Sequence, residues 1–292
     1  MTIFLSDRQI IEISGSDRYQ FLQGLITNDI FQLKKNKNLL YSAMLSAKGR
    51  FLYDFFIFKD INDEKIYLDC FYQRTEEIIK KLSIYKLKSD ITITKNDQIL
   101  AFWQKNAEKQ QKTFDNNSFY GILDDPRSKK MGQRLYVNHK IDYQDNVTIY
   151  HLTRILNKIC EGEYDLTYDK SLILEFGFDN LNAISYNKGC YMGQELTART
   201  HHMGQIRKKI YNIEIDNANQ FLSSSELKSV ANQSNLLKNI EITLMDSPVG
   251  IILSSVIIDN KILALALLKE SINNVNSGFN NLLARNHPLK FL

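Results

Sequence analysis

The sequence predicts an α+β protein that ends in a small β-barrel, and three observations lead to this prediction. Up to Cys160, apolar runs typical of strands alternate with amphipathic helical segments. After Gly204 the chain changes to short strands joined by polar turns, as in a small closed barrel. With 292 residues, 43% of them hydrophobic, the chain is long enough for two cores. We therefore expect an α+β region over 1–204 and a barrel domain over 205–292.

The N-terminal half starts with a short strand over 10–13, and Ser16 is the expected N-cap of the helix that follows. Phe21, Leu22 and Ile26 fall on one face of that helix. The remaining elements of this half are predicted from apolar periodicity: strands at 39–45, 51–58, 65–71, 91–94 and 98–103, and an amphipathic helix at 75–87.

The C-terminal half begins beyond a polar connection at 104–118. A turn at 123–127, a strand at 134–137 and a long helix at 145–160 come next. The barrel strands are expected at 206–215, 240–245, 249–258 and 261–269. Asp259-Asn260-Lys261 interrupts the most apolar stretch and indicates a hairpin turn.

Composition excludes several classes of protein. A net charge of +4 suits an anionic ligand but predicts no stable nucleic-acid binding. The sequence has no apolar run of about 18 residues, so we expect no membrane span. The three cysteines form neither a C-x-x-C pair nor a zinc spacing, which indicates a reducing compartment. The N-terminus resembles neither a signal nor a transit peptide. We expect a cytoplasmic monomer, or a mitochondrial matrix protein if the source is a eukaryote.

Residues 187–205 hold the densest group of chemically reactive side chains in the sequence. If 188–190 is extended, Lys188 and Cys190 point to the same face. A helix is expected over 192–200, so its N-terminus follows the cysteine closely. Helix N-termini and nearby cations favour the thiolate, which predicts a nucleophilic or metal-binding thiol. The alternative is a small buried cysteine that packs as an apolar residue.

The cysteine motif resembles the YgfZ family, folate-binding iron–sulfur maturation factors related to the glycine-cleavage T protein. Further matching segments occur in the same order, from about residue 10 to about residue 268. The segments that carry the resemblance are Phe21-Leu22-Gln23-Gly24-Leu25-Ile26-Thr27-Asn28-Asp29, Ser46-Ala47-Lys48-Gly49-Arg50, Leu174-Glu175, Lys188-Gly189-Cys190-Tyr191-Met192-Gly193-Gln194-Glu195, and Arg199 with Gly204.

The resemblance implies a T-protein-like N-terminal portion of two intertwined α+β subdomains, a C-terminal barrel and a central ligand cavity. It also implies an accessory factor, rather than a catalyst, that binds tetrahydrofolate or a related folate. Such a factor supports assembly or repair of [4Fe–4S] clusters in client enzymes, including radical enzymes that modify tRNA. Its partners would be iron–sulfur assembly proteins and these clients, and Cys190 could ligate a cluster only transiently, together with another thiol.

Several residues are candidates for the folate cavity, each with a simpler structural alternative. Asn28 and Asp29 could bind the pterin edge or cap a helix. Arg50 could face the cavity or belong to a hairpin turn. The remaining candidates are Gln194, Glu195, Glu175 and Arg199. For Gln194 and Glu195 the alternative is helix capping or compensation of the helix dipole.

Three other functions remain open at this stage. A folate-dependent aminomethyl or one-carbon transferase is the main alternative, although the T protein lacks the Lys-Gly-Cys motif. An RNA-binding module would need a recognisable platform, which the sequence lacks. A cysteine hydrolase would need a histidine beside Cys190. His201 and His202 are adjacent, so they diverge and are expected to be solvated rather than to share a metal ion.

Overall fold

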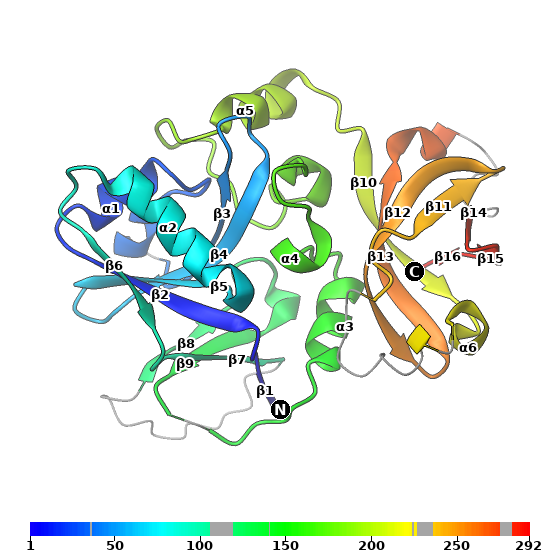
Figure 1. The fold of residues 1–292 in the computed structure, drawn as a ribbon, viewed down its shortest axis with the longest axis horizontal. Helices are drawn as coiled ribbons and strands as arrows, with labels where there is room; N and C mark the ends of the chain where they lie inside the picture. Colours follow the sequence, from blue (N-terminus) through cyan, green and yellow to red (C-terminus); the bar gives the residue numbers. More distant parts are fainter. Residues whose placement is uncertain (36, 106–118, 140, 224, 227–235, 275–281) are drawn as a thin grey trace. The chain divides into compact units, whose positions relative to one another are not determined.

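The computed structural model describes residues 1–292 except 36, 106–118, 140, 224, 227–235 and 275–281. The chain forms two compact units, each assembled from separate segments. The first comprises 1–145, 168–170 and 179–198. The second comprises 146–167, 171–178 and 199–292. Figure 1 labels the helices and strands of both.

A five-stranded antiparallel sheet forms the centre of the first unit, with strand order β3-β4-β5-β2-β6. Its central strands are almost entirely buried, because both faces of the sheet are covered. Continuous apolar runs of this kind suit such a position better than strict alternation does. The strands are β2 (Arg8–Ser14), β3 (Leu40–Leu45), β4 (Phe51–Lys59), β5 (Lys65–Phe71) and β6 (Thr92–Asn96).

Two helices, α1 (Arg18–Gln23) and α2 (Thr75–Lys86), supply apolar side chains to the core of this sheet. Leu22 of α1 and Leu82 of α2 are both almost completely buried there. Each such leucine contributes roughly 1.5–3 kcal/mol through burial. Two short 3-10 helices, η1 (Ile30–Lys34) and η2 (Tyr72–Arg74), complete the connections.

A second antiparallel sheet in the first unit has the order β1-β7-β9-β8. Asp69 on β5 links it to the five-stranded sheet, because this carboxylate accepts hydrogen bonds from Arg134 and Tyr136 on β9. Arg8 binds the same carboxylate at 2.6 Å, and all these groups are buried. Removing one partner from such a buried cluster typically costs about 3–5 kcal/mol. The strands are β1 (Thr2–Phe4), β7 (Leu100–Gln104), β8 (Phe119–Asp124) and β9 (Gln133–Val137), with η3 (Lys129–Met131) between the last two.

The second unit contains short helices held by another buried ion pair. Arg154 Nη1 of α3 (Thr148–Leu156) lies 2.7 Å from Asp165 Oδ2, at the end of α4 (Gly162–Asp165). Asp165 also accepts from the backbone N–H groups of Glu161 and Ser254, so one carboxylate joins α4 to the barrel strand β12 (Ser247–Ile258). The remaining elements of this unit outside its sheet are η4 (Ile173–Phe176), the second half of α5 (Gln194–Met203), α6 (Ala218–Phe221) and η5 (Glu270–Asn274).

A seven-stranded sheet with the order β15-β14-β11-β12-β13-β10-β16 makes up the rest of the second unit. Its two edge strands are consecutive in sequence and are separated only by Leu289, so a single segment pairs with both ends of the sheet. The sheet is therefore nearly closed, as a small barrel requires. The strands are β10 (Lys208–Ile215), β11 (Glu241–Leu244), β12 (Ser247–Ile258), β13 (Lys261–Lys269), β14 (Leu282–Ala284), β15 (His287–Pro288) and β16 (Lys290–Phe291).

The predicted α+β class with a barrel-like C-terminal sheet is confirmed, as are most of the long strands. Two local predictions were wrong. The N-cap of α1 is Asp17 rather than Ser16, whose hydroxyl instead donates to Asp90. The helix expected over 145–160 spans only Thr148–Leu156, and Lys158 beyond it adopts a left-handed conformation with φ 57°.

The expected domain boundary at 204–205 remains a prediction. The two compact units divide the chain differently, because the second unit also includes 146–167 and 171–178. Most of the polar connection expected at 104–118 lies outside the described residues. Short strands such as β1 and β14 were not predicted, because two or three residues show no measurable periodicity.

Candidate functional site

Cys190 lies in a loop of the first unit, residues 186–193, which we call the cysteine loop. Its side chain is exposed, whereas Cys70 and Cys160 are buried. Burial raises the pKa of the Cys70 thiol to about 12 and holds that of Cys160 well above its usual value. Because reactivity needs both access and the thiolate, Cys190 is the candidate reactive thiol. The alternative of a buried structural cysteine at this position is wrong.

Lys188 anchors the cysteine loop through its ammonium group. Its Nζ atom donates to the carbonyl oxygens of Ile26 and Asn28, at 2.7 Å in both cases. Burial lowers the pKa of Lys188 to about 8, and the nearby Asp29 carboxylate partly opposes that shift. The ammonium also lies 5.1 Å from the centre of the Tyr191 ring. Residues 188–190 are not part of a strand, and the expected placement of Lys188 and Cys190 on one face stays a prediction.

Asn28 and Thr27 tie the segment before the cysteine loop to strand β3. Asn28 Nδ2 donates to the carbonyl oxygens of Tyr41 and Asn182, both at 2.8 Å. Asn28 Oδ1 accepts from the backbone N–H of Asp29. Thr27 Oγ1 donates to the carbonyl oxygen of Ala183 at 2.7 Å. Both amide hydrogens of Asn28 are therefore used inside the protein, which gives this predicted ligand-binding residue a clear structural task.

Two glycines let the β3–β4 turn pack directly against the end of the cysteine loop. A Cβ atom on Gly193 would lie 2.4 Å from the carbonyl oxygen of Ser46, and one on Gly49 would lie 2.7 Å from Cβ of Leu196. Both glycines also have positive φ angles, 79° and 73°, which disfavour larger residues. The two sequence motifs around Gly49 and Gly193 are thus neighbours in space, and each needs a glycine at the contact.

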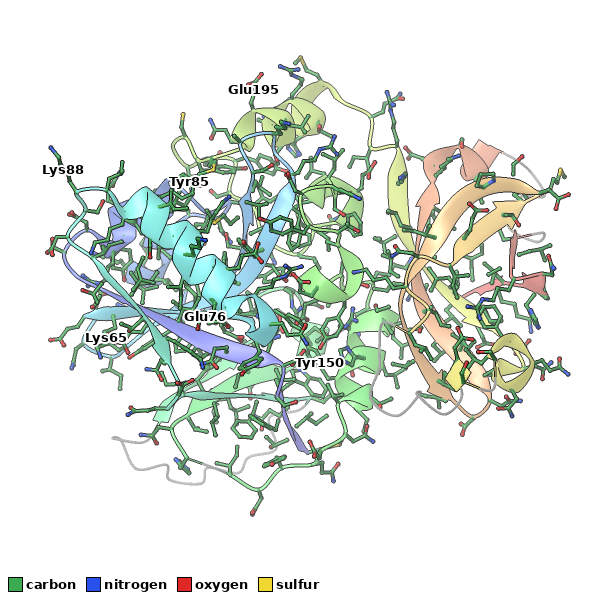
Figure 2. All side chains as sticks on the ribbon, in the orientation of Figure 1. Lys65, Glu76, Tyr85, Lys88, Tyr150 and Glu195 are labelled. Carbon is green, nitrogen blue, oxygen red and sulfur yellow. The ribbon has the colours of Figure 1, made fainter. Side chains whose placement is uncertain are left out.

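The loop continues into helix α5 through two further hydrogen bonds. The backbone N–H of Met192 donates to the carbonyl oxygen of Gly24 at 3.0 Å. Gln194 Oε1 accepts from the backbone N–H of Tyr191, also at 3.0 Å. The helix begins at Gln194, two residues later than predicted. Glu195 is exposed in its first turn and projects outward in Figure 2, in keeping with the predicted compensation of the helix dipole.

Asp29 and Arg50 lie near these contacts and have partners of their own. Asp29 caps η1, because its side chain accepts from the backbone N–H of Phe31. Gln23 Nε2 donates to the same oxygen, Oδ1 of Asp29, at 3.0 Å. Arg50 Nη1 donates to the carbonyl oxygen of Lys170 at 2.9 Å. The capping alternative for Asp29 is therefore confirmed, and a role in ligand binding stays a prediction.

The predicted site residues are divided between the two units. Lys188, Asn28 and Asp29 come together around the cysteine loop, and the first unit also holds Cys190, Arg50, Gln194 and Glu195. The second unit holds Glu175, in η4, and Arg199, in the second half of α5. The expected central cavity with the sulfur at its rim stays a prediction.

Within the described part of the chain, histidine, cysteine, aspartate and glutamate side chains nowhere gather in threes around a possible metal position. His201 and His202 are exposed, as the sequence predicts for a solvated pair. Among the helices that the structure describes, none is long and apolar enough to cross a membrane.

Sequence reasoning missed the contacts that hold the loop from outside its own motif. Asn182 and Ala183 offer only backbone carbonyl oxygens, which leave no trace in a side-chain pattern. The Gly49–Gly193 contact did have a signal, because both glycines stand inside recognisable motifs. What the site offers chemically is a single accessible thiol on a loop that hydrogen bonds brace on both sides. That defines a class by its chemistry, two-unit α+β proteins with a barrel-like second sheet and one exposed cysteine on an anchored loop.

Comparison with known proteins identifies specific relatives of this chain. No protein-family model matches the chain. The chain is 32% identical over 251 residues to the mitochondrial iron-sulfur cluster assembly factor IBA57 homolog of Dictyostelium discoideum, a match that covers 71% of the chain and 60% of that relative. It is 31% identical over 216 residues to the homolog of Pyricularia oryzae, with 70% and 55% covered. The mouse IBA57 factor is 29% identical over 238 residues, with 73% and 65% covered.

The chain thus spans little more than half the length of the first two relatives. These relatives are eukaryotic IBA57 factors. They support the expected YgfZ-like family in its coarser form, and membership of bacterial YgfZ itself stays a prediction. Among solved structures, the glycine cleavage system aminomethyltransferase T of Bartonella henselae matches with a TM-score of 0.71 at 10% identity. That match covers 99% of this chain and 84% of the other, and it establishes the T-protein fold.

Proposed function

We propose that this protein is an accessory factor for the assembly or repair of iron–sulfur clusters, [4Fe–4S] clusters in particular, and that Cys190 is its working residue. Two observations support the proposal. The relatives reported above are named as iron-sulfur cluster assembly factors. Cys190 is the exposed cysteine of the three and lies on a loop held by the hydrogen bonds of Lys188 Nζ to the carbonyl oxygens of Ile26 and Asn28. The second observation is the one that assigns the proposed function to a particular residue, Cys190.

In this proposal, Cys190 offers one thiolate ligand to an iron atom of a cluster or cluster precursor, which is the cargo. A cluster is normally held by four cysteine thiolates. Cys70 and Cys160 are buried, and burial raises the pKa of both thiols, so neither supplies a second ligand. The remaining ligands must come from a partner protein or a small thiol. Ligation is then transient, and the anchored loop keeps the sulfur in place for the partner.

Tetrahydrofolate, or a related folate, belongs to the proposal as a ligand of the T-protein-like fold. Asp29 fits such a role, because its Oδ1 is used in capping while its Oδ2 has no hydrogen bond to the described residues. A free carboxylate oxygen suits the N–H groups of a pterin edge. Asn28 fits less well as a direct ligand, since both its amide hydrogens are already used. The further candidates are Arg50, Gln194, Glu195, Glu175 and Arg199.

The partners in this proposal are iron–sulfur assembly proteins and their client enzymes, including those that modify tRNA. The relatives' names place those proteins in mitochondria, and we propose the same compartment for this chain. The test is a client's cluster-dependent activity in cells that carry only the Cys190→Ala variant. We expect that activity to be lost, whereas the neighbouring exposed substitution Asn187→Ala retains it. Full client activity with Cys190→Ala would overturn the assignment.

Alkylation of the folded protein checks the chemical premise separately. Iodoacetamide should modify Cys190 alone, because the other two thiols are buried. Mass spectrometry of tryptic peptides identifies the labelled residue. Labelling of Cys70 or Cys160 at a comparable rate would show that access does not single out Cys190.

A one-carbon transferase is the second candidate, favoured by the fold shared with aminomethyltransferase T. It predicts folate-dependent formaldehyde release by the purified protein. Cys190→Ala should leave that release unchanged if the T-protein reaction is present, since the proposed thiol chemistry is not part of it. Turnover that survives Cys190→Ala, combined with normal client activity, would replace the assembly role with the transferase.

A further inference from the structure

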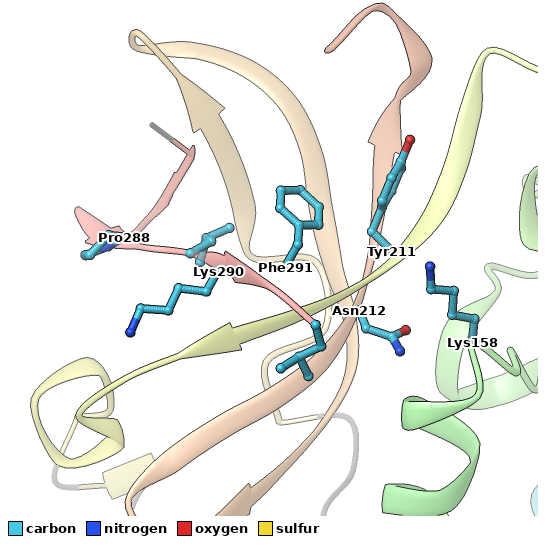
Figure 3. A pocket seen from close by; sticks show the side chains of 8 residues that line it. Lys158, Tyr211, Asn212, Pro288, Lys290 and Phe291 are labelled. Atoms are coloured by element: carbon cyan, nitrogen blue, oxygen red, sulfur yellow. The ribbon is translucent and has the colours of Figure 1, made fainter. Parts of the chain in front are cut away.

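A pocket in the second unit has no part in the proposed function. It has a volume of about 670 Å³, within the range of small-molecule sites. Figure 3 shows it beside β10 and β16, with Lys158 reaching toward Tyr211 and Asn212 from beyond the end of α3. All of its lining residues belong to the second unit, so the pocket is a feature of that unit alone.

The pocket contains a buried hydrogen-bond acceptor with nothing to accept from. Asn212 is only 5% exposed, and its Nδ2 donates to the carbonyl oxygen of Leu156 at 3.0 Å. This bond fixes the amide, and Oδ1 is left buried without a hydrogen-bond partner among the described residues. A buried polar atom without a partner costs about 1–3 kcal/mol. A ligand that brings an N–H or O–H group to this oxygen would remove that penalty.

The other walls add aromatic surface and positive charge. The rings of Tyr211 and Phe291 pack edge to face, with centres 5.4 Å apart. Lys158 Nζ lies 5.9 Å from the centre of the Tyr211 ring, whereas Lys290 is paired with Asp216 on the outside. Lys158 is therefore the ammonium available to an incoming anion. A flat ring against Tyr211 and Phe291 would occupy the apolar part of the pocket.

We propose that this pocket binds an anionic heteroaromatic small molecule of the nucleotide type. Its ring lies against Tyr211 and Phe291, a ring or exocyclic N–H donates to Asn212 Oδ1, and its anionic group pairs with Lys158. Such a ligand satisfies all three features of the pocket together, and neither a simple anion nor an uncharged ring does so. The site is independent of Cys190 and of the cluster chemistry proposed above.

Isothermal titration calorimetry with adenosine monophosphate on the full chain tests this proposal. Lys158→Asn removes the ammonium, and asparagine tolerates the left-handed backbone at that position, where φ is 57°. We expect it to weaken binding about tenfold, the loss typical of one charge-assisted hydrogen bond. Lys209→Gln is the matched control, because Lys209 lies on the same strand β10 but pairs with Glu270 outside the pocket. It should bind as the unchanged protein does.

Asn212→Leu should abolish the contact to the ligand's N–H group, and circular dichroism establishes whether that variant folds. If it does not fold, Lys158→Asn alone decides the outcome. Adenosine and inorganic phosphate serve as separate probes, and each should bind at least tenfold more weakly than adenosine monophosphate. The proposal is overturned if adenosine monophosphate fails to bind at millimolar concentration, if either fragment binds equally well, or if Lys158→Asn has no effect.

Discussion

Replacing Asn28 by alanine removes the side chain that joins three segments around the cysteine loop. Asn28 is 4% exposed, and its amide makes three hydrogen bonds of 2.8 Å, to Tyr41 O, to Asn182 O and from Asp29 N. At about 1 kcal/mol net for each bond, their loss costs about 3 kcal/mol. The carbonyl oxygens of Tyr41 and Asn182 also lose a buried donor. We therefore expect Asn28→Ala to lower the free energy of unfolding by about 3–4 kcal/mol.

Urea denaturation followed by tryptophan fluorescence measures this loss directly. Trp103 is the single tryptophan of the sequence, is fully buried, and lies in the same unit as Asn28. The signal therefore reports on unfolding of the unit that carries the substitution. Asn187→Ala is the matched control, because Asn187 is exposed and neighbours Lys188 in the cysteine loop. Exposed substitutions of this kind usually change the free energy of unfolding by less than about 0.5 kcal/mol.

A loss below about 1 kcal/mol for Asn28→Ala, indistinguishable from that of Asn187→Ala, would refute the reasoning. It would mean that the three hydrogen bonds are exchanged for water at no cost, so that Asn28 is not a structural anchor. The residue would then be available as a ligand-binding side chain, as the sequence alone allows.

Two further predictions concern the same loop. Gly193→Ala should lower the free energy of unfolding by about 2 kcal/mol or more, because its Cβ would clash with Ser46 O and the positive φ disfavours alanine. The control Gly189→Ala, whose Cβ meets nothing within 4 Å, should change it by less than about 0.5 kcal/mol. Equal losses for the two variants in urea denaturation would argue against the close turn contact. Burial lowers the pKa of Lys188 from 10.5 in the unfolded chain to about 8, so the unfolded state binds more protons between these values and stability should rise with pH across this window. After allowance for partial exposure the gain is about 2 kcal/mol, and Lys188→Met should lack it; parallel pH profiles for the two proteins would contradict this assignment.

Sequence patterns predicted the elements that have long apolar runs or a clear helical period. Strands β4 and β13 lie close to the ranges expected because they are nearly continuous apolar runs, and helix α2 does so because Ile78 and Leu82 share one buried face. The closing segment of the barrel, β15 and β16, was not foreseen. Two-residue strands are determined by partners far away in the chain, and no local pattern records such pairing.

The residues of the candidate site were predicted from the sequence, but the hydrogen bonds that they form were not. The exposed Cys190 was expected, since glycines and polar residues surround it in the sequence. Lys188 was expected to act on the thiol, yet its ammonium is directed at the carbonyl oxygens of Ile26 and Asn28. Backbone acceptors belong to every residue type alike. A sequence pattern therefore does not indicate which backbone carbonyl oxygens a lysine will bind.

The contrast between one accessible cysteine and two buried ones limits how this protein responds to oxidants. A disulfide requires two sulfur atoms that can approach within about 2 Å, and the buried thiols of Cys70 and Cys160 cannot reach the outside without unfolding. Oxidation of thiols in the folded chain is thus confined to a single position. Its disulfide products are a mixed disulfide with a small thiol or a crosslink to another molecule, and ordinary thiol exchange reverses both.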